Sequence, residues 1–164
     1  MPSMKDVRTF KDSTTFTLKE AHLTKKKCVE TEKRDIPSSD GLQWWARYHP
    51  AGDRDAAKNY ISLYVCFNKP VTATYTFAVN NAFFNYTHTY KFKKSPFGVG
   101  YYQYASHEKL RPLFRDGKLT ITCSIETDIE VPFVLSVPRV FQLFDHVPTD
   151  VEIVVGSKKI QVRL

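Results

Sequence analysis

The stretch of sequence that decides the fold is Tyr60-Ile61-Ser62-Leu63-Tyr64-Val65-Cys66-Phe67, in which two kinds of side chain alternate. One parity holds Ile61, Leu63, Val65 and Phe67, and the other holds Tyr60, Ser62, Tyr64 and Cys66. Because successive side chains of a β-strand point to opposite faces of the sheet, this pattern predicts a half-buried strand. We expect the aliphatic face to be buried, and the Tyr/Ser face to be partly exposed or to line a cleft.

The same alternation continues on both sides of this stretch. Val71–Val79 and Leu119–Glu126 each carry apolar residues on one parity and mostly hydroxyl-bearing residues on the other. Further strands are predicted at Thr15–Leu23, Cys28–Ile36, Leu42–Tyr48 and Tyr86–Phe92, and only Ala105–Leu113 could form a helical turn or two. Many short strands separated by Gly, Pro, Asn and Asp turns predict an all-β protein, an antiparallel β-sandwich.

The composition narrows the classes of protein. The chain has 164 residues, a formal net charge of +7 and three cysteines, Cys28, Cys66 and Cys123, which are too scattered for a disulfide framework or a zinc site. Neither an N-terminal signal peptide nor an apolar run of about 20 residues is visible, so we expect no membrane segment and a location in the cytoplasm, the nucleus or both. The positive charge alone leaves nucleic acid, an acidic membrane surface or an acidic protein open as partners.

No catalytic motif stands out in the sequence. There is no nucleophile elbow, no zinc-protease helix motif, no phosphate-binding loop and no dinucleotide fingerprint. The segment Phe97-Gly98-Val99-Gly100 lacks the strand–helix context of a phosphate cradle, and the five histidines are scattered. We therefore predict a protein that is not an enzyme, with no catalytic residues, no metal site and no cofactor.

Basic and aromatic residues are concentrated in residues 86–115, which hold six Lys or Arg side chains against the single acid Glu108. Such a segment suits a groove for single-stranded nucleic acid, because cations contact phosphates and rings stack on bases. It suits a peptide-binding groove equally well, and also a solvated lysine face over a buried aromatic core. The residues alone leave these alternatives open.

Five ordered pieces of the chain resemble a MATH (TRAF-like) domain. Leu42–Gly52, LQWWARYHPAG, followed by Asn59–Val65, NYISLYV, is similar to the family's Trp-containing strand, Pro-x-Gly turn and Tyr-Leu-Ser-Leu-Tyr-like strand. Val71–Asn81, Tyr90–Gly98 and Asp116–Ile121 resemble later strands and a Gly-containing loop in the same order. The resemblance covers residues 5–131 and implies the same sandwich.

The C-terminal tail resembles the start of a BTB/POZ domain. Phe141–Asp145 is similar to its connector, and Thr149–Gly156 followed by Lys159–Val162 is similar to its opening hairpin. The expected organisation is thus a MATH domain at 5–131, a linker at 132–148 and the hairpin of a truncated BTB/POZ domain at 149–164. We expect a fragment or a degenerate member of the nematode-type MATH–BTB family, which is similar to speckle-type POZ protein.

The resemblance implies a function and a site. MATH–BTB proteins are substrate adaptors of cullin–RING ubiquitin ligases in ubiquitin-dependent protein degradation, and their MATH groove binds short Ser/Thr-containing linear motifs of substrate proteins. Carried over residue by residue, the groove comprises Arg47, Tyr64, Tyr75, Tyr90, Phe92, Phe97, Gly98 and Val99. Arg47 and Tyr64 lie on the parity opposite the apolar faces, so they can face outward. Tyr75 and Phe92 share parity with apolar residues, which leaves core and groove equally open for them.

The implied partners are therefore substrate proteins, with a cullin scaffold only if a complete BTB domain follows, and we expect this chain to be monomeric. Lys91, Lys93 and Lys94 would favour acidic or phosphorylated peptides. The alternatives are a nucleic-acid-binding domain, ranked lower, and a stand-alone MATH scaffold without ligase function. A trimeric TRAF-type receptor scaffold would have a coiled coil before the sandwich, and residues 1–20 show no heptad pattern.

Overall fold

The computed structural model describes residues 5–80, 86–92, 98–132, 151–155 and 158–162. The chain divides into two units, of which Lys5–Val131 is the larger and the C-terminal hairpin belongs to the other. None of the helices within the described residues is long and apolar enough to cross a membrane.

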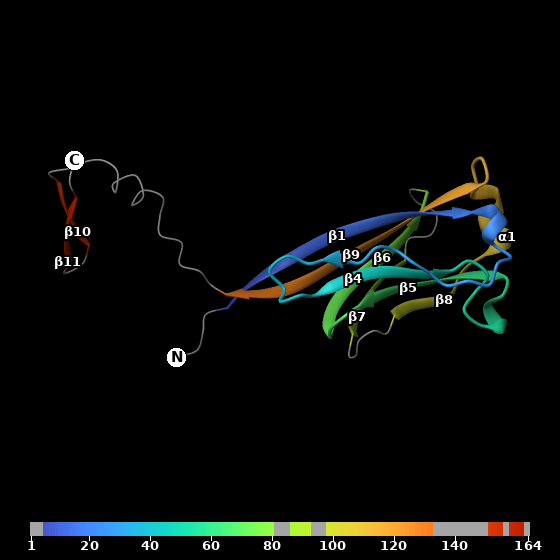
Figure 1. Ribbon diagram of the computed structural model, residues 1–164, viewed down its shortest axis with the longest axis horizontal. Helices are drawn as coiled ribbons and strands as arrows, with labels where there is room; N and C mark the ends of the chain where they lie inside the picture. Colours follow the sequence, from blue (N-terminus) through green and yellow to red (C-terminus); the bar gives the residue numbers. More distant parts are fainter. Residues whose placement is uncertain (1–4, 81–85, 93–97, 133–150, 156–157, 163–164) are drawn as a thin grey trace. The chain divides into compact units, whose positions relative to one another are not determined.

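The larger unit consists of two β-sheets (Figure 1). The first sheet has the strand order β1 (Lys5–Lys19), β9 (Lys118–Pro132), β6 (Val71–Val79) and β7 (Tyr86–Phe92). The second contains β2 (Val29–Glu30), β4 (Gln43–His49), β5 (Tyr60–Phe67) and β8 (Gly98–Ser106) in that order, with β3 (Arg34–Asp35) also paired to β4. The pairs β4–β5, β5–β8, β6–β7 and β6–β9 are antiparallel, so the predicted antiparallel β-sandwich is confirmed.

The alternating patterns supply the core between the sheets. Strand β5 contributes Ile61, Leu63, Val65 and Phe67, all at most 1% exposed, and β6 and β9 contribute their apolar parities in the same way. The other parity of β5 matches the expectation of a partly exposed Tyr/Ser face only at its two tyrosines. Ser62 and Cys66 are both fully buried, because a loop and β8 cover that side of the strand, whereas Tyr60 and Tyr64 remain half-buried.

Some of the predicted strands differ from those in the structure. Strand β1 begins at Lys5 rather than near Thr15, and Cys28–Ile36 forms two very short strands instead of one. The early half of β1 has no apolar alternation, and its pairing with β9 is supported by polar contacts such as Lys5 Nζ to Glu130 Oε2 at 2.9 Å and Thr9 Oγ1 to Asp128 Oδ1 at 2.7 Å. A hydrophobic pattern cannot reveal a strand whose cross-strand pairs are polar.

Short helical pieces close one end of the sandwich. The predicted turn within Ala105–Leu113 is present as α1 (His107–Leu110) and the 3-10 turn η3 (Arg111–Leu113), with further 3-10 turns at η1 (Glu20–His22) and η2 (Asp55–Ala57). Ser106 caps α1, because its hydroxyl accepts a hydrogen bond from the Lys109 backbone N–H at 3.2 Å.

In the second unit, β10 (Val151–Val155) and β11 (Lys158–Val162) form an antiparallel hairpin with Val151 opposite Val162. The predicted C-terminal hairpin is therefore present. Its assignment to a BTB/POZ domain, and the domain boundaries at residues 131 and 148, remain predictions.

Asp12 ties the two sheets together at one edge. This residue lies on β1 of the first sheet, and its carboxylate accepts hydrogen bonds from the Trp44 Nε1–H at 2.9 Å and from Arg34 Nε at 2.7 Å, both on the second sheet. A second Arg34 nitrogen, Nη2, donates to the other carboxylate oxygen at 2.9 Å, which makes the ion pair bidentate. The hydrogen bond from Arg34 lowers the pKa of Asp12 below its usual value of 3.8, and the Trp44 N–H adds to this against the opposing effect of burial.

We predict that, in the acidic range, the free energy of unfolding of Asp12→Asn depends less on pH than that of the wild type. Since the folded-state pKa of Asp12 lies below the unfolded one, its contacts stabilise the fold above the usual carboxyl pKa, and this stability is lost as pH falls through the folded-state pKa. Urea unfolding between about pH 5 and about pH 1 should give a shallower pH dependence for Asp12→Asn than for the wild type. Parallel curves for the two proteins would show that Asp12 carries no such linkage.

Candidate functional site

The outer face of the second sheet carries two rows of cross-strand neighbours. Arg47 on β4 pairs with Tyr64 on β5, which pairs in turn with Gly100 on β8. The neighbouring row consists of Trp45, Cys66 and Gly98. These side chains point away from the core, because the alternate residues of the same strands, such as Trp44, Leu63 and Val65, lie inside it.

The two glycines bring β8 very close to β5. A Cβ at Gly98 would stand 2.9 Å from the Tyr64 Cβ and 3.0 Å from the Cys66 Sγ. A Cβ at Gly100 would stand only 2.0 Å from the Leu63 carbonyl oxygen. On its β8 side, Tyr64 is therefore flanked by backbone that carries no side chains. Strand β8 is the last strand in the described order of the second sheet. An edge strand of this kind offers backbone N–H and C=O groups to an added extended peptide.

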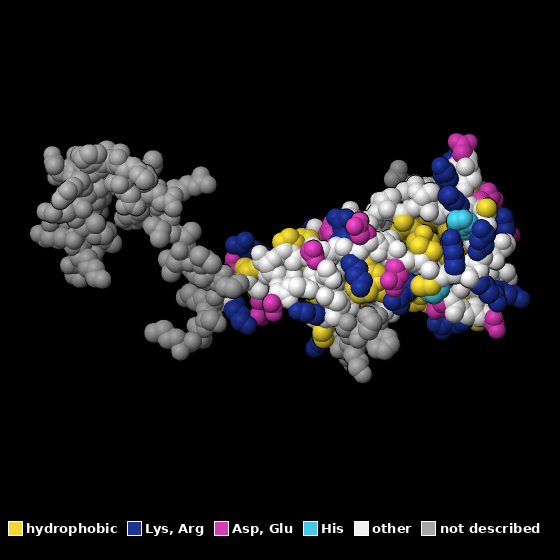
Figure 2. All heavy atoms as spheres, viewed as in Figure 1, with side chains coloured by type: hydrophobic (Ala, Val, Ile, Leu, Met, Phe, Trp, Pro, Cys, Tyr) yellow, Lys and Arg dark blue, Asp and Glu magenta, His cyan; other side chains and the backbone are white. Residues whose placement is uncertain are grey.

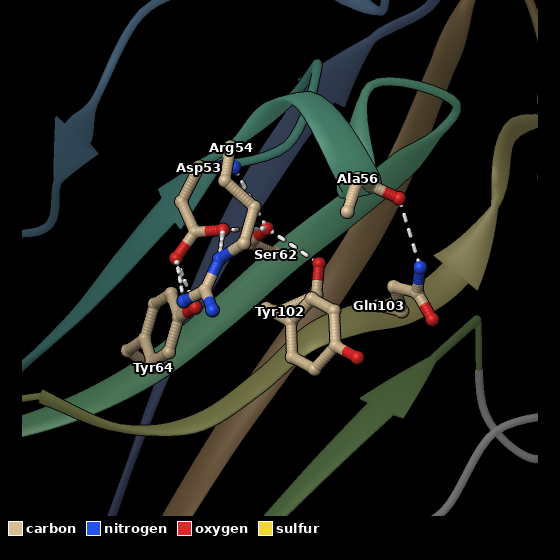
Figure 3. Close-up of polar contacts among 7 residues, drawn as sticks. All are labelled: Asp53, Arg54, Ala56, Ser62, Tyr64, Tyr102 and Gln103. Carbon is tan, nitrogen blue, oxygen red and sulfur yellow. Dashed lines mark hydrogen bonds and ion pairs between the residues drawn. The ribbon is translucent and has the colours of Figure 1, made fainter.

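The loop between β4 and β5 lies on this face and contacts Tyr64 (Figure 3). The Tyr64 hydroxyl donates a hydrogen bond to the Asp53 carboxylate. The Asp53 backbone N–H donates to the Ser62 hydroxyl at 3.0 Å, and that hydroxyl donates to the Tyr102 carbonyl oxygen on β8 at 2.7 Å. The loop, β5 and β8 are thus joined by one set of hydrogen bonds.

Backbone geometry and two side chains fix this loop in place. Gly52 has a φ of +78°, and a Cβ there would stand 2.1 Å from the Ala57 carbonyl oxygen, so only glycine allows the turn. Gln103 Nε2 donates to the Ala56 carbonyl oxygen at 2.9 Å, and the His107 ring Nε2 lies 2.7 Å from the Pro50 carbonyl oxygen. The loop is consequently held from both β8 and α1.

Burial and neighbouring charges set the protonation states of Tyr64 and Asp53. The hydrogen bonds from Arg54 lower the pKa of Asp53, and the Tyr64 hydroxyl lowers it further against the effect of burial. Burial first, and then Asp53, raise the pKa of Tyr64 to about 12. At neutral pH Asp53 is therefore ionised, and Tyr64 is a neutral donor whose proton is directed at Asp53. Next to Tyr64, burial lowers the pKa of His49, whose ring meets the Tyr64 ring edge-on at 6.1 Å.

Arg47 forms a cross-strand ion pair with Glu30 of β2. Arg47 Nη2 lies 2.7 Å from Glu30 Oε1, and Nε donates to the same oxygen at 2.8 Å. This pairing lowers the pKa of Glu30. Because the Arg47 side chain keeps 27% of its surface exposed, its remaining donors can reach a ligand on the outer face.

The predicted site residues do not all come together. Arg47, Tyr64 and Gly98 share the outer face of the second sheet. Tyr75 and Phe92 are core residues, 2% and 3% exposed, because their parity faces the other sheet, so neither ring is open to a ligand. The sequence left core and groove open for Tyr75 and Phe92, and the structure places both residues in the core.

Two further predicted residues, Val99 and Tyr90, lie away from this group. Val99 is opposite Val65 and packs against the core from a partly buried position. Tyr90 is 39% exposed on β7 of the first sheet, with its ring 5.4 Å from that of Phe92. Phe97 lies outside the described residues.

Sequence reasoning missed Asp53, Arg54, Tyr102 and Gly100. The only sequence signal near them was the Pro50-Ala51-Gly52 turn and the second glycine of Gly98-Val99-Gly100. Among the residues that the structure describes, no group of three or more His, Cys, Asp or Glu side chains could hold a metal ion.

The two sheets, their strand order and the edge strand β8 define a TRAF-like (MATH-like) β-sandwich. A solved structure similar to it is TRAF5 of Notothenia coriiceps, with a TM-score of 0.54 over 76% of this chain and 77% of that one. The two sequences are 12% identical over the match, so the likeness is one of fold. No protein-family model matches the sequence, and no curated protein matches it.

Proposed function

We propose that this chain is a non-enzymatic peptide-recognition module that binds short Ser/Thr-containing linear motifs on the outer face of its second sheet. The observation that carries the proposal is the row Arg47–Tyr64–Gly100, which places a tyrosine and a cation beside bare backbone at a sheet edge. A tyrosine offers apolar area together with a hydroxyl, and an edge strand offers backbone hydrogen bonds, so an extended peptide could use both.

The finer proposal is a substrate adaptor of the MATH–BTB kind, which selects substrates for a cullin–RING ubiquitin ligase in the cytoplasm or nucleus. It rests on the sequence resemblance of residues 149–164 to a BTB start, and cullin binding would require a complete BTB domain. In this proposal the chain alone is a monomer. Lys91 is exposed on β7 of the first sheet, on the parity opposite the buried Phe92, so it does not lie on the outer face of the second sheet.

We predict that Tyr64→Ala weakens the binding of Ser/Thr-rich peptides by more than about tenfold, because central tyrosines are frequent binding hot spots. Peptides first selected on an array would be titrated by calorimetry against the wild type, Tyr64→Ala and Phe97→Ala. Tyr60→Ala, which removes a half-buried tyrosine from the same strand, is the matched control and should bind like the wild type. If a folded Tyr64→Ala protein bound these peptides as tightly as the wild type, the peptide site would not lie on the outer face of the second sheet.

Nucleic-acid binding is the second candidate, favoured by the basic side chains at one end of the sandwich and by exposed aromatic rings. Figure 2 shows Lys and Arg side chains gathered at the end of the sandwich where α1 lies. Partial desolvation, and then Lys27, Lys25 and Lys19, lower the pKa of His22 at this end. The exposed rings Tyr90 and Tyr102 lie on β7 and β8. Binding of a single-stranded oligonucleotide that falls steeply with salt, without peptide binding, would reverse the ranking.

A further inference from the structure

The guanidinium of Arg54 is held by a carboxylate and an aromatic ring beside the candidate site (Figure 3). Arg54 Nε and Nη2 donate to the two Asp53 oxygens, each at 2.9 Å, in a bidentate fork. The Arg54 Cζ lies 4.6 Å from the centroid of the Tyr102 ring. A carboxylate that accepts a fork and an aromatic face that accepts a planar cation are the two groups that recognise a guanidinium.

Both recognition groups are positioned without help from Arg54. Asp53 is fixed by its backbone hydrogen bond to Ser62 and by the Tyr64 hydroxyl, and its side chain is only 15% exposed. Tyr102 is fixed on β8, where its carbonyl oxygen accepts from Ser62, and it remains 42% exposed. If Arg54 left, an ionised carboxylate and an open ring would remain in place.

The Arg54 side chain lies largely in solvent. It is 55% exposed. Beyond Asp53 and Tyr102, the Arg54 side chain lies close enough to the Tyr64 hydroxyl to affect its pKa, and the Arg54 backbone carbonyl oxygen accepts from the Ala57 N–H at 2.9 Å. Because this side chain is open to solvent, a second guanidinium can approach the Asp53 carboxylate and the Tyr102 ring and exchange with that of Arg54.

We propose that Asp53 and Tyr102 form a guanidinium-binding subsite, occupied by Arg54 in the free chain, and that an arginine of a bound peptide replaces Arg54 there. The proposal rests on the peptide-binding function and names one side chain of the motif. The subsite favours arginine over lysine, because an ammonium can neither form the planar fork nor stack in the same way. It also disfavours an anionic side chain at this point of the motif, since Asp53 is ionised.

The test uses the full chain and a small probe, Nα-acetyl-arginine N-methylamide, followed by the backbone amide NMR signals of Asp53, Ser62 and Tyr102. Arg54→Ala removes the internal competitor, so the probe should bind about three- to fivefold more tightly than to the wild type. Asp53→Asn in the Arg54→Ala background should abolish the shifts, and Tyr102→Ala in that background should weaken them.

Two controls make the outcome specific. The uncharged isostere Nα-acetyl-citrulline N-methylamide should cause no shifts in any variant. Arg8→Ala removes an exposed arginine that is paired with Asp6 at 3.6 Å on β1, and it should bind the probe like the wild type. Equal shifts with citrulline, or no gain in affinity for Arg54→Ala, would overturn the proposal.

Failure of the subsite can be told apart from failure of the proposed function. The probe titration needs no peptide ligand, so it reports on Asp53 and Tyr102 alone. If array peptides bind through Tyr64 but tolerate citrulline in place of every arginine, the subsite is wrong and the peptide-binding function stands. If the arginine probe binds as expected while no peptide depends on Tyr64, the proposed function fails instead.

Discussion

Replacing Trp44 with alanine is expected to lower the free energy of unfolding by about 3–5 kcal/mol, the usual cost of emptying a buried tryptophan position. Trp44 is 0% exposed and is among the largest fully buried side chains of the described core. Its Nε1–H also donates to Asp12 at 2.9 Å, so the substitution opens a cavity and removes one bond of the contact between the two sheets. Both effects act in the same direction.

Chemical denaturation followed by circular dichroism would measure this loss. Trp44→Phe is the matched variant, because it keeps a ring in the core but removes the N–H donor. Its expected cost is about 1–2 kcal/mol, from a smaller cavity and one lost hydrogen bond. If Trp44→Ala unfolded within experimental error of the wild type, the assignment of Trp44 to the core would be untenable.

Gly100→Ala is expected to cost about 3 kcal/mol or more, since strain and overpacking rank among the mechanisms of large destabilisation. A Cβ at this position would stand 2.0 Å from the Leu63 carbonyl oxygen and 2.9 Å from the Tyr64 Cα, both of them backbone atoms. Neither can move without separating β8 from β5. The substitution should therefore weaken both the fold and peptide binding, because Tyr64 lies directly opposite Gly100.

Gly117→Ala provides the control for a glycine with space around it. Gly117 has a φ of +71° and no atom within 4 Å of a Cβ, so alanine there meets only backbone strain, costing about 1 kcal/mol. Thermal and urea unfolding of the two variants should show that Gly100→Ala is much less stable than Gly117→Ala. The reverse order would mean that β8 does not approach β5 as closely as described.

The sequence predicted the strands whose two faces differ in polarity. Tyr60–Phe67, Val71–Val79 and Tyr86–Phe92 have the bounds that their patterns indicated. The early half of β1 gave no such signal, because polar side chains lie on both of its faces and pair with residues of β9 far along the chain. Strand β8 was not predicted, because its glycine-rich start was interpreted as a loop.

For the candidate site, the alternation of side chains along each strand was enough to place Arg47 and Tyr64 on an outer face. It could not tell whether Tyr75 and Phe92 lie in the core or in the groove. Both rings have apolar neighbours at the same parity, and burial depends on the opposite sheet, which no local pattern contains. Asp53 and Arg54 were missed for a related reason. Nothing in a turn sequence indicates that its carboxylate will accept a hydrogen bond from a tyrosine of the following strand.

The sequence by itself determined the class of the fold, the inward face of its central strands and a basic, aromatic chain without a catalytic motif. These follow from local alternation and composition, because the side-chain period of a strand is fixed by backbone geometry. The tertiary structure alone decided which residues meet on the outer face. Arg47, Tyr64 and Gly100 become neighbours only through strand register, and Asp53 reaches Tyr64 only because Gly52 turns the loop back onto β5. Register and loop packing depend on contacts between distant segments, so they cannot be read from any one stretch of the chain.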